Sequence, residues 1–203
     1  MKLYYSNGAC SLAPHIALRE AGLPFELVRA STKTHKLDDG TDFYSINPKG
    51  YVPVLELDDG ERLTEAGVIL QYIADLAPAA KLAPPFGTLE RYRLMEWLNF
   101  ITSELHKSFA PLFYPSHEET QAAARASIAR RLAWVDEQLA QPGHELLMGS
   151  HFTVADAYLF TVVNWTQWVK IDVQQWPHIA AYMDRIRERP AVQAALRAEG
   201  LLR

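Results

Sequence analysis

One change of pattern divides this chain of 203 residues, at the stretch APAAKLAPPFGT that spans residues 77–88. Before this stretch, short apolar runs with strand character alternate with helical patterns, whereas every later pattern is helical. The stretch contains three prolines, one glycine and a single charged residue, a composition typical of a boundary between domains. We therefore expect two domains, at 1–77 and 88–203, joined by a linker at 78–87.

The elements expected in the first domain follow the order strand, helix, strand, then helix, two strands and helix. The strands are expected at 2–5 and 25–29 and in a hairpin over 52–63, where DDG separates two apolar runs. The helices are expected at 11–22, 42–47 and 65–76. This order, βαβ-α-ββα, predicts a small α/β domain.

The second domain is expected to be all helical. The expected helices lie at 88–113, 118–140, 154–169, 177–188 and 190–198. The third of them begins with Thr153-Val-Ala-Asp156, a capping-box pattern. In the first, an apolar stripe is expected in the core and a polar stripe of Asn99, Ser103 and His106 on another face.

Composition excludes several classes of function. The formal net charge of −4 gives no field that attracts nucleic acid or anionic lipid. The N-terminal MKLYYSNG lacks the apolar run of a signal peptide, and no stretch reaches the roughly 18 apolar residues of a membrane span. The chain has one cysteine, which suits a reducing compartment. We expect a cytoplasmic protein that binds neither nucleic acid nor membranes, and no metal, since the histidines lack ligand spacing.

The single cysteine, Cys10, stands where the first strand hands over to the first helix. Backbone N–H groups at a helix N-terminus stabilise a thiolate and lower a cysteine pKa from ~8.5 to ~7 or below. A buried apolar cysteine is the alternative, which the flanking Gly8, Ala9 and Ser11 disfavour. Ala13 stands three residues on, where dithiol oxidoreductases have a second cysteine. Thiol chemistry at Cys10 would therefore need an external thiol, for which glutathione is the abundant candidate.

The segment NPKGYVPVLELDDGERLTEAG contains two further candidate binding features. Val52 precedes Pro53 at the start of a strand, where a cis bond would turn the main chain of Val52 toward a peptide-like ligand. Glu65 and Ala66 open a helix, where backbone N–H groups would hold a ligand carboxylate and Glu65 a ligand ammonium. An ordinary loop proline and an ordinary helix cap are the alternative interpretations.

Taken together, these motifs resemble those of a cytosolic glutathione S-transferase. The resemblance is carried by YYS-x-GACSL-x-PHI-x-LRE-x-G, INPKGYVPVLELDDG and LTEAGVILQYIAD, and continues through EWLNFITSELHKSFAPLF and HFTVADAYLF. It covers nearly the whole chain and implies a thioredoxin-like first domain. Cys10 and His106 resemble the bacterial beta class.

The resemblance implies a role for each matching residue of the first domain. Cys10 would meet the glutathione sulfur, and Val52, before a cis Pro53, would pair its main chain with the cysteinyl part. Glu65 and Ala66 would hold the γ-glutamyl end.

The sequence departs from the class at the residue that would bind the glycyl carboxylate of glutathione. The class often has a lysine for this carboxylate, whereas this chain has His35 followed by Lys36. A neutral imidazole binds a carboxylate less well than an ammonium does. Either Lys36 substitutes, or the affinity for glutathione falls.

In the second domain, the resemblance places His106 near Cys10, where it would stabilise a thiolate or donate a proton. Asn99 and Ser103 would position the tripeptide in concert with a partner subunit. The hydrophobic substrate would meet three aromatic side chains, Phe109, Phe113 and Trp165. Because related classes use a tyrosine or a serine near the first turn, Tyr5 and Ser11 are alternative activators.

We therefore expect a homodimeric glutathione transferase that conjugates the glutathione thiolate to hydrophobic electrophiles, with glutathione as co-substrate and no tightly bound cofactor. A second hypothesis is thiol-disulfide, peroxidase or dehalogenase activity through a mixed disulfide between Cys10 and glutathione. A third is a non-catalytic binding or regulatory module on the same fold, because fold does not fix function.

Overall fold

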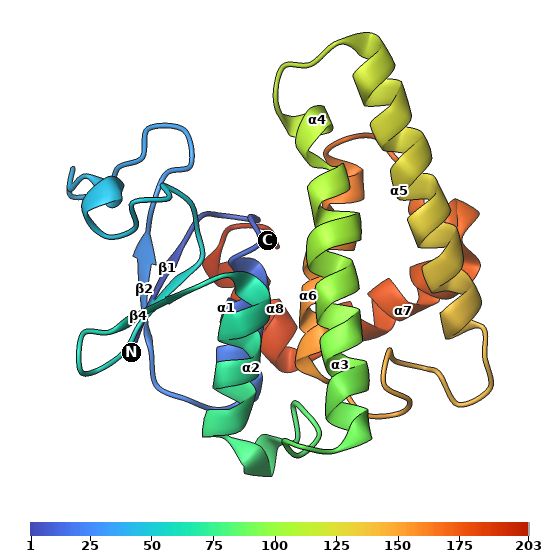
Figure 1. Ribbon diagram of the computed structural model, residues 1–203, viewed down its shortest axis with the longest axis horizontal. Helices are drawn as coiled ribbons and strands as arrows, with labels where there is room; N and C mark the ends of the chain where they lie inside the picture. Colours follow the sequence, from blue (N-terminus) through green and yellow to red (C-terminus); the bar gives the residue numbers. More distant parts are fainter. Residues whose placement is uncertain (203) are drawn as a thin grey trace. The chain divides into compact units, whose positions relative to one another are not determined.

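The computed structural model describes residues 1–202 and forms two compact units (Figure 1). Unit 1 comprises Met1–Ala83 together with the C-terminal segment that begins at Arg189, and unit 2 comprises Pro84–Glu188. The boundary at 83–84 falls within the expected linker. The grouping differs from a second domain over 88–203, because the last helix belongs to unit 1.

Unit 1 is built on a four-stranded mixed sheet. Its strands are β1 (Lys2–Tyr5), β2 (Glu26–Arg29), β3 (Val54–Glu56) and β4 (Arg62–Thr64), in the order β2-β1-β3-β4. β1 and β2 are parallel because a helical crossover joins them, whereas β3 pairs antiparallel with β1 and with β4. The predicted thioredoxin-like arrangement is confirmed.

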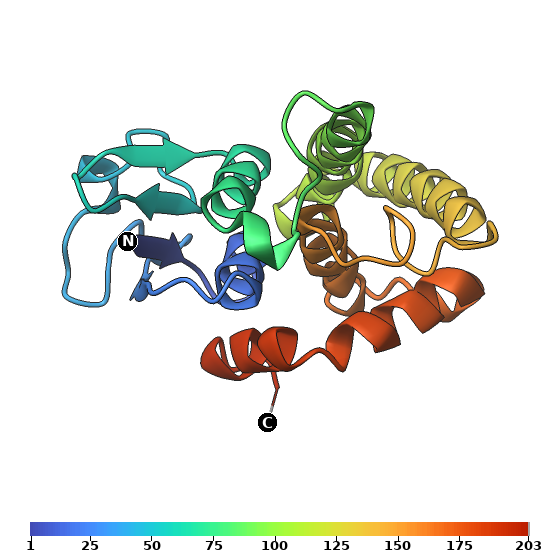
Figure 2. The same ribbon diagram turned by 90° about the horizontal axis from the view of Figure 1, so that it is seen from below.

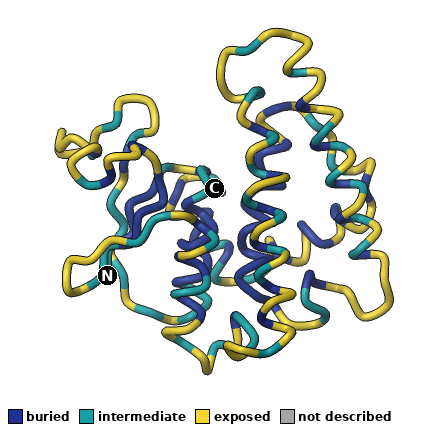
Figure 3. The backbone as a smooth tube through the Cα atoms, in the orientation of Figure 1, coloured by how far each residue is buried: buried dark blue, intermediate teal, exposed yellow. Residues whose placement is uncertain are grey.

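Three helices belong to unit 1: α1 (Leu12–Glu20), α2 (Ala66–Leu76) and α8 (Pro190–Ala198). Short 3₁₀ turns form at η1 (Phe43–Ser45) and η2 (Pro78–Ala80). Figure 2 shows α1 and α2 side by side along the sheet, and α8 packs on α1. As a result, every residue of α1 from Leu12 to Leu18 is buried (Figure 3).

Both faces of the sheet are covered. Tyr4 and Val54 pack with Phe43 of η1 in one apolar cluster. Leu3 and Leu55, which take the alternate positions on these strands, are completely buried as well. The central strands β1 and β3 are therefore packed on both faces, which fixes the positions of the turns at their ends.

Unit 2 is helical, as expected. Its helices are α3 (Leu89–Asn99), η3 (Phe100–His106), α4 (Ala110–Phe113), α5 (Glu118–Leu139), α6 (Val154–Val163), η4 (Asn164–Gln167), η5 (Val173–Gln175) and α7 (Pro177–Arg187). All ten residues of α6 are buried, so α6 is the central helix of the unit. The expected core stripe is confirmed, since Leu94, Leu98, Ile101 and Leu105 are at most 3% exposed.

The single helix expected at 88–113 is instead broken into three parts, of which η3 is π-helical. The hydroxyl groups of Thr102 and Ser103 donate to the carbonyls of Leu98 and Asn99, four residues earlier, at 2.8 and 2.9 Å. Such bonds compete with the backbone ladder. Pro111 lacks an N–H, so no α-helical bond continues through it. The helix expected at 154–169 likewise ends at Val163 and continues as the 3₁₀ turn η4.

Candidate active site

Cys10 lies in the turn between β1 and α1, one residue before the N-cap Ser11, and is partly exposed. Its Sγ donates to the carbonyl oxygen of Val52 at 3.3 Å. The thiol therefore stands at the beginning of α1, where the helix dipole favours a negative charge. It also lies against the segment that leads into β3.

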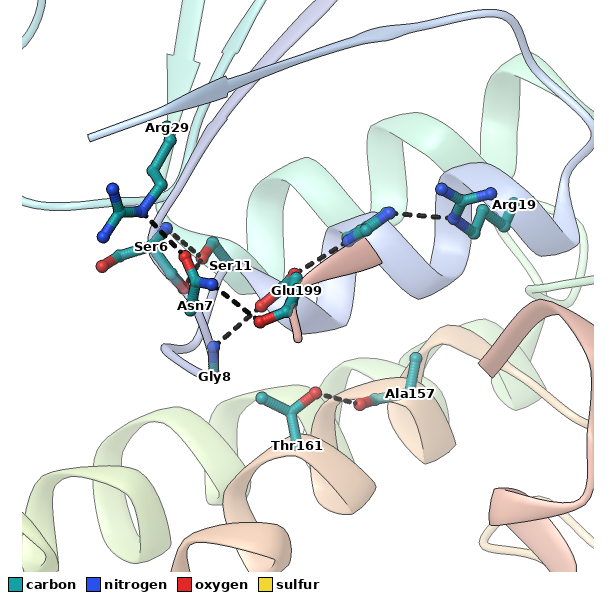
Figure 4. A network of polar contacts seen from close by, with 10 residues as sticks. Ser6, Asn7, Gly8, Ser11, Arg19, Arg29, Ala157, Thr161 and Glu199 are labelled. Atoms are coloured by element: carbon teal, nitrogen blue, oxygen red, sulfur yellow. Dashed lines mark hydrogen bonds and ion pairs between the residues drawn. The ribbon is translucent and has the colours of Figure 1, made fainter. Parts of the chain in front are cut away.

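The turn that carries Cys10 is anchored by Glu199, from the C-terminal end of the described chain (Figure 4). The Gly8 N–H donates to the Glu199 carboxylate at 2.8 Å, and the Asn7 side chain donates to the Glu199 carbonyl at 2.7 Å. Glu199 is 1% exposed. Nothing in the sequence pattern indicated this anchor, because the partners lie almost the full chain length apart.

His15 connects the Glu199 carboxylate to Arg19. The imidazole is completely buried, its Nδ1 lies 2.8 Å from Glu199, and its Nε2 accepts from Arg19 Nε at 2.8 Å. Since Nε2 accepts, Nδ1 carries the proton and donates to the carboxylate. The ring is thus neutral and bridges a buried anion to a partly buried cation.

The two alternative activators are held within the same turn. The Ser11 hydroxyl is buried, accepts from the Ser6 N–H at 3.1 Å and donates to the Ser6 carbonyl at 3.2 Å. Burial, reinforced by the Glu199 charge, raises the pKa of the Tyr5 phenol and disfavours its ionised form. Both arrangements favour Cys10 over its neighbours as the reactive group.

The Val52–Pro53 peptide bond is cis. The turn before it is fixed by Asn47, which is 2% exposed: its side-chain amide donates to the Tyr51 carbonyl at 2.7 Å, and its backbone carbonyl accepts from Gly50 at 2.8 Å. The main chain of Val52 is therefore held in one conformation beside Cys10.

His35 is tied to the same turn. Its Nδ1 lies 2.8 Å from the Gly50 carbonyl, and its ring lies 4.7 Å from the Tyr44 ring. Because a carbonyl only accepts, Nδ1 carries the proton, and Nε2 of the neutral ring is left as an acceptor. A neutral His35 thus offers no donor to a carboxylate at Nε2, whereas the exposed Lys36 offers an ammonium.

Glu65 caps α2 with φ 69° and ψ 113°, and its side chain is about half exposed. Oε1 of Glu65 accepts from Lys49 Nζ at 2.5 Å and from the Tyr51 hydroxyl at 3.1 Å. Ala66, the first residue of α2, is 6% exposed. Sequence analysis singled out Glu65 and Ala66 but missed Lys49 and Tyr51, which belong to the turn before the cis bond.

In unit 2, Asn99 ends α3, and Ser103 and His106 lie in η3. Asn99 and Ser103 are exposed and His106 is partly exposed. The Ser103 hydroxyl is bonded to the Asn99 carbonyl, and Nδ1 of His106 lies 2.8 Å from the hydroxyl of the buried Tyr158. Tyr158, which was not predicted, holds the imidazole in place.

The three aromatic candidates gather around His106 in unit 2. The Phe109 ring lies 6.2 Å from Phe113 and 5.6 Å from Trp165, whose ring is 4.7 Å from the His106 ring. Phe113 is 43% exposed, whereas Phe109 and Trp165 are buried. Phe113 therefore offers an apolar contact surface, and the buried rings of Phe109 and Trp165 pack against it.

Comparison with known proteins identifies the family. Two family models match, the glutathione S-transferase N-terminal domain over residues 1–75 and the glutathione S-transferase C-terminal domain over residues 100–190. Glutathione S-transferase GstA of Escherichia coli O157:H7 is 49% identical over 202 residues, which are 99% of this chain and 100% of that protein. The chain belongs to the glutathione S-transferase family.

Solved structures of glutathione S-transferases agree closely with this one. A bacterial beta class glutathione S-transferase from Sphingomonas chungbukensis has a TM-score of 0.95 and 51% identity, with 100% of both chains covered. A sphingomonad glutathione S-transferase complexed with glutathione has a TM-score of 0.94 and 51% identity, covering 99% of this chain and 100% of that one. The resemblance to the beta class is confirmed, and with it the expectation of a glutathione transferase.

Residues 1–202 contain neither a candidate membrane-spanning helix nor a candidate metal cluster. None of the helices there has the length and apolar character needed to cross a membrane. Within the same residues, no group of three or more histidine, cysteine, aspartate or glutamate side chains is arranged to hold a metal ion.

Proposed function

We propose that the protein conjugates the thiolate of glutathione to hydrophobic electrophiles, with glutathione as co-substrate and no resident cofactor. The observation that carries this proposal is the 3.3 Å contact between Cys10 Sγ and the Val52 carbonyl. It brings a thiol at a helix N-terminus to the main chain beside a cis proline. A cysteinyl peptide paired with Val52 would therefore have its own sulfur next to Cys10.

In this proposal, unit 1 binds the tripeptide. The main chain of Val52, turned by Pro53, pairs with the cysteinyl part, and Glu65 and Ala66 hold the γ-glutamyl end. The glycyl carboxylate is bound by the exposed ammonium of Lys36, beside His35. A relative at 51% identity was solved in complex with glutathione, which supports glutathione as the ligand.

Unit 2 supplies the remaining roles. His106, held by Tyr158, stabilises the glutathione thiolate or donates a proton, and Asn99 and Ser103 position the tripeptide. Phe109, Phe113 and Trp165 form the apolar contact for the electrophile. In the reaction, the thiolate electron pair forms a sulfur–carbon bond and the leaving group departs with the electron pair of the bond that breaks.

Calorimetry with glutathione and a turnover assay with an aryl halide test the proposal. We expect the wild-type protein to bind glutathione and to form the thioether, and Cys10→Ala to lower kcat/KM at least tenfold, about the effect of losing one charge-assisted contact to the reacting sulfur. The control is Ser6→Ala, which changes the same turn and leaves the thiol. Absence of glutathione binding by the wild-type protein would refute the proposal. Binding without turnover would favour a non-catalytic module.

The partly exposed Cys10 favours one second candidate function, reduction of disulfides. The Cys10 thiolate would attack the glutathione sulfur of a mixed disulfide between glutathione and another thiol, and that thiol would leave as its thiolate. A free glutathione thiolate would then attack the Cys10–glutathione disulfide, which forms glutathione disulfide and regenerates Cys10. Mass spectrometry after incubation with glutathione disulfide tests this step. A reducible adduct of one glutathione on Cys10 would support it, and an unmodified thiol would exclude it.

We further propose that the protein acts in the cytoplasm as a homodimer. Its single cysteine suits a compartment rich in reduced glutathione. In unit 2, the Trp97, Phe100 and Trp134 rings lie against one another, and Trp134 is 41% exposed, a surface that a second copy would cover. Light scattering during size-exclusion chromatography should give twice the mass of one chain, and the mass of a single chain would contradict the proposal.

A further inference from the structure

We propose that the groove between α1 and α8 is a second binding site, which takes a small aromatic carboxylate. This groove, the α1–α8 groove, has a volume of about 590 Å³. It is lined by the end of α1, by the turn that follows to Phe25 and by the beginning of α8 from Pro190 to Ala194, all of which belong to unit 1. Cys10 precedes the N-terminus of α1, so the groove lies at the other end of this helix from the thiol.

Most of the lining of the α1–α8 groove is apolar. Leu18 is completely buried, and Leu23 and Phe25 are partly buried. On α8, the small side chains of Ala191 and Ala194 leave the space open. Clefts of roughly 300–1,000 Å³ with apolar walls and a few polar groups are typical of small-molecule sites. The groove therefore suits a flat apolar ring.

Arg19 is the cation of the groove, and its side chain is fixed. Its Nε donates to Nε2 of the buried His15 at 2.8 Å, and its Cζ lies 5.6 Å from the centre of the Phe25 ring. Among residues 1–202, Arg19 has no hydrogen-bond acceptor other than His15. The N–H groups of its two terminal nitrogens thus remain open to a ligand. A guanidinium presents these groups in the geometry that a carboxylate accepts.

The other charges at the groove do not oppose an anion. Glu20 also lines it, but both of its carboxylate oxygens are bound by Arg189, at 2.6 and 2.9 Å, and its side chain is 13% exposed. Arg19, in the last turn of α1, offsets the negative end of that helix.

The beginning of α8 adds to the attraction for an anion. Pro190 is the first residue of this helix, and the N-cap residue Arg189 provides no side-chain acceptor to its first amides. The positive end of the α8 dipole therefore lies at the groove. Arg19 and this helix start give the groove a positive potential in a protein whose net charge is −4.

An aromatic carboxylate satisfies both features of the groove. Its anionic group would accept hydrogen bonds from the Arg19 guanidinium, while its ring would lie against Phe25 and the alanines of α8. A neutral aromatic compound would gain the apolar contact alone. Acetate would gain the ionic contact alone, which solvent weakens at a partly exposed position. The groove should therefore select ligands that carry both groups.

Calorimetry on the full-length protein tests this assignment with three compounds. They are 2-naphthoate, 2-naphthalenemethanol, which has the same rings without the charge, and acetate, which has the charge without the rings. We expect 2-naphthoate to bind at least tenfold more tightly than either of the others. In Arg19→Gln, affinity for 2-naphthoate should fall about tenfold, the effect of losing one charge-assisted contact, and affinity for 2-naphthalenemethanol should be unchanged. Ala194→Leu, which narrows the groove and leaves the cation, should weaken binding of both aromatic compounds.

Two control variants locate the binding. Arg197→Gln removes an exposed arginine of α8 that does not line the groove, and Phe113→Ala removes the exposed ring of the aromatic group in unit 2. Both should leave affinity for 2-naphthoate unchanged, and urea denaturation verifies that each variant is folded.

Four outcomes would overturn the inference. They are absence of 2-naphthoate binding by the wild-type protein, unchanged affinity in Arg19→Gln or in Ala194→Leu, an equal loss for both aromatic compounds in Arg19→Gln, and a loss in Phe113→Ala. None of them bears on the proposed function, which is tested by glutathione binding and turnover.

Discussion

Gly50 lies in the candidate site at a position with no room for an added carbon. Its φ is +73°, and a Cβ built on it would lie 2.4 Å from Cε1 of Tyr44. The Tyr44 ring in turn lies against His35, which bonds to the Gly50 carbonyl. A side chain at position 50 would therefore strain the backbone and displace the ring that supports His35.

We expect Gly50→Ala to lower the free energy of unfolding by ~2–3 kcal/mol, from the left-handed backbone and the displaced ring. Gly60→Ala is the matched control, because Gly60 has φ +88° with nothing within 4 Å of a Cβ, and should cost ~1 kcal/mol. Urea denaturation measures both. Equal losses of unfolding free energy in the two variants would show that the Tyr44 ring moves aside at no energetic cost.

The hydroxyl of Tyr158 is the second contact that we test at this scale. We expect Tyr158→Phe to leave KM unchanged and to lower kcat roughly fivefold, the effect of one lost hydrogen bond, because His106 loses its fixed orientation. Steady-state kinetics with glutathione and an aryl halide measure both constants. Tyr114→Phe, at a side chain that is 68% exposed, should change neither. A rise in KM at constant kcat would contradict a role for His106 in the chemical step.

Residues were predictable where the pattern that marks them is local. Cys10, Val52 and Glu65 stand in short motifs whose chemistry is readable from adjacent residues. Lys49 and Tyr51 were missed because their partner, Glu65, lies 16 and 14 positions away, on the far side of a hairpin. Their role depends on the cis turn that brings the two segments together.

Among the elements, α6 has an N-terminus held by several hydrogen bonds to one buried side chain, Asp156. The Asp156 side chain accepts from the N–H of Leu147 and Thr153 and from the hydroxyls of Thr153 and Tyr182, at 2.8 to 3.1 Å. The capping box predicted from Thr153 to Asp156 is confirmed. The contacts with Leu147 and Tyr182 join this helix start to the preceding loop and to α7.

We expect Asp156→Asn to lower the free energy of unfolding by ~2–3 kcal/mol, since the new amide group faces donors and loses acceptor positions. Urea denaturation of this variant, with Asp184→Asn as an exposed control, measures the loss. A change within ~0.5 kcal/mol, as for ordinary surface substitutions, would contradict a structural role for the carboxyl group.

The carboxyl group of Asp156, at the start of α6, makes the folding stability of the protein depend on pH. Burial raises the pKa of the Asp156 carboxyl in the folded protein, against the pull of its four donors. The folded state therefore binds this proton more tightly than the unfolded chain. The resulting stabilisation is complete below the unfolded pKa of ~3.9 and is lost as pH rises through the folded pKa. The stability advantage over Asp156→Asn should thus narrow as pH rises from ~4, and an advantage that widens would contradict this sign.

The periodicity of apolar residues predicted which segments are helical, but it did not predict where a helix is interrupted. Helical spacing indicated the positions of α5, α7 and α8 to within a few residues, and for α3 the start alone, because each of these helices buries an apolar face. The break after Asn99 arises from hydroxyl groups that bond back to the backbone ladder, and Pro111 lies at the later break, where α4 begins. These are individual contacts that average hydropathy does not register.

At the scale of the molecule, the last helix returns to unit 1. α8 packs on α1, Arg189 forms two bonds with Glu20 at 2.6 and 2.9 Å, and Glu199 reaches Gly8 and His15. Composition located the change at residues 77–88 but gave no sign of this return. The contacts between Glu199 and unit 1 span 184 to 192 positions, beyond any pattern read along the chain.

We expect Glu199→Ala to lower the free energy of unfolding by ~3–5 kcal/mol, since it leaves the buried His15 and the Gly8 N–H without their acceptor. Hydrogen exchange at the Gly8 amide should accelerate in the same variant. Glu61→Ala, at an exposed position of unit 1, should change stability by less than ~0.5 kcal/mol. Native-like protection of Gly8 in Glu199→Ala would show that the turn holds without its anchor.

The Glu199 anchor also orders events during synthesis. A ribosome delivers the β1 turn 191 residues before Glu199, so the strands of the sheet can pair long before the Gly8 amide meets its acceptor. Until then, the turn that carries Cys10 lacks the hydrogen bond between Gly8 and Glu199. A nascent chain, or a product that stops at Glu188, would expose that thiol without its mature surroundings. The turn that carries Cys10 is thus completed only after Glu199 has been translated.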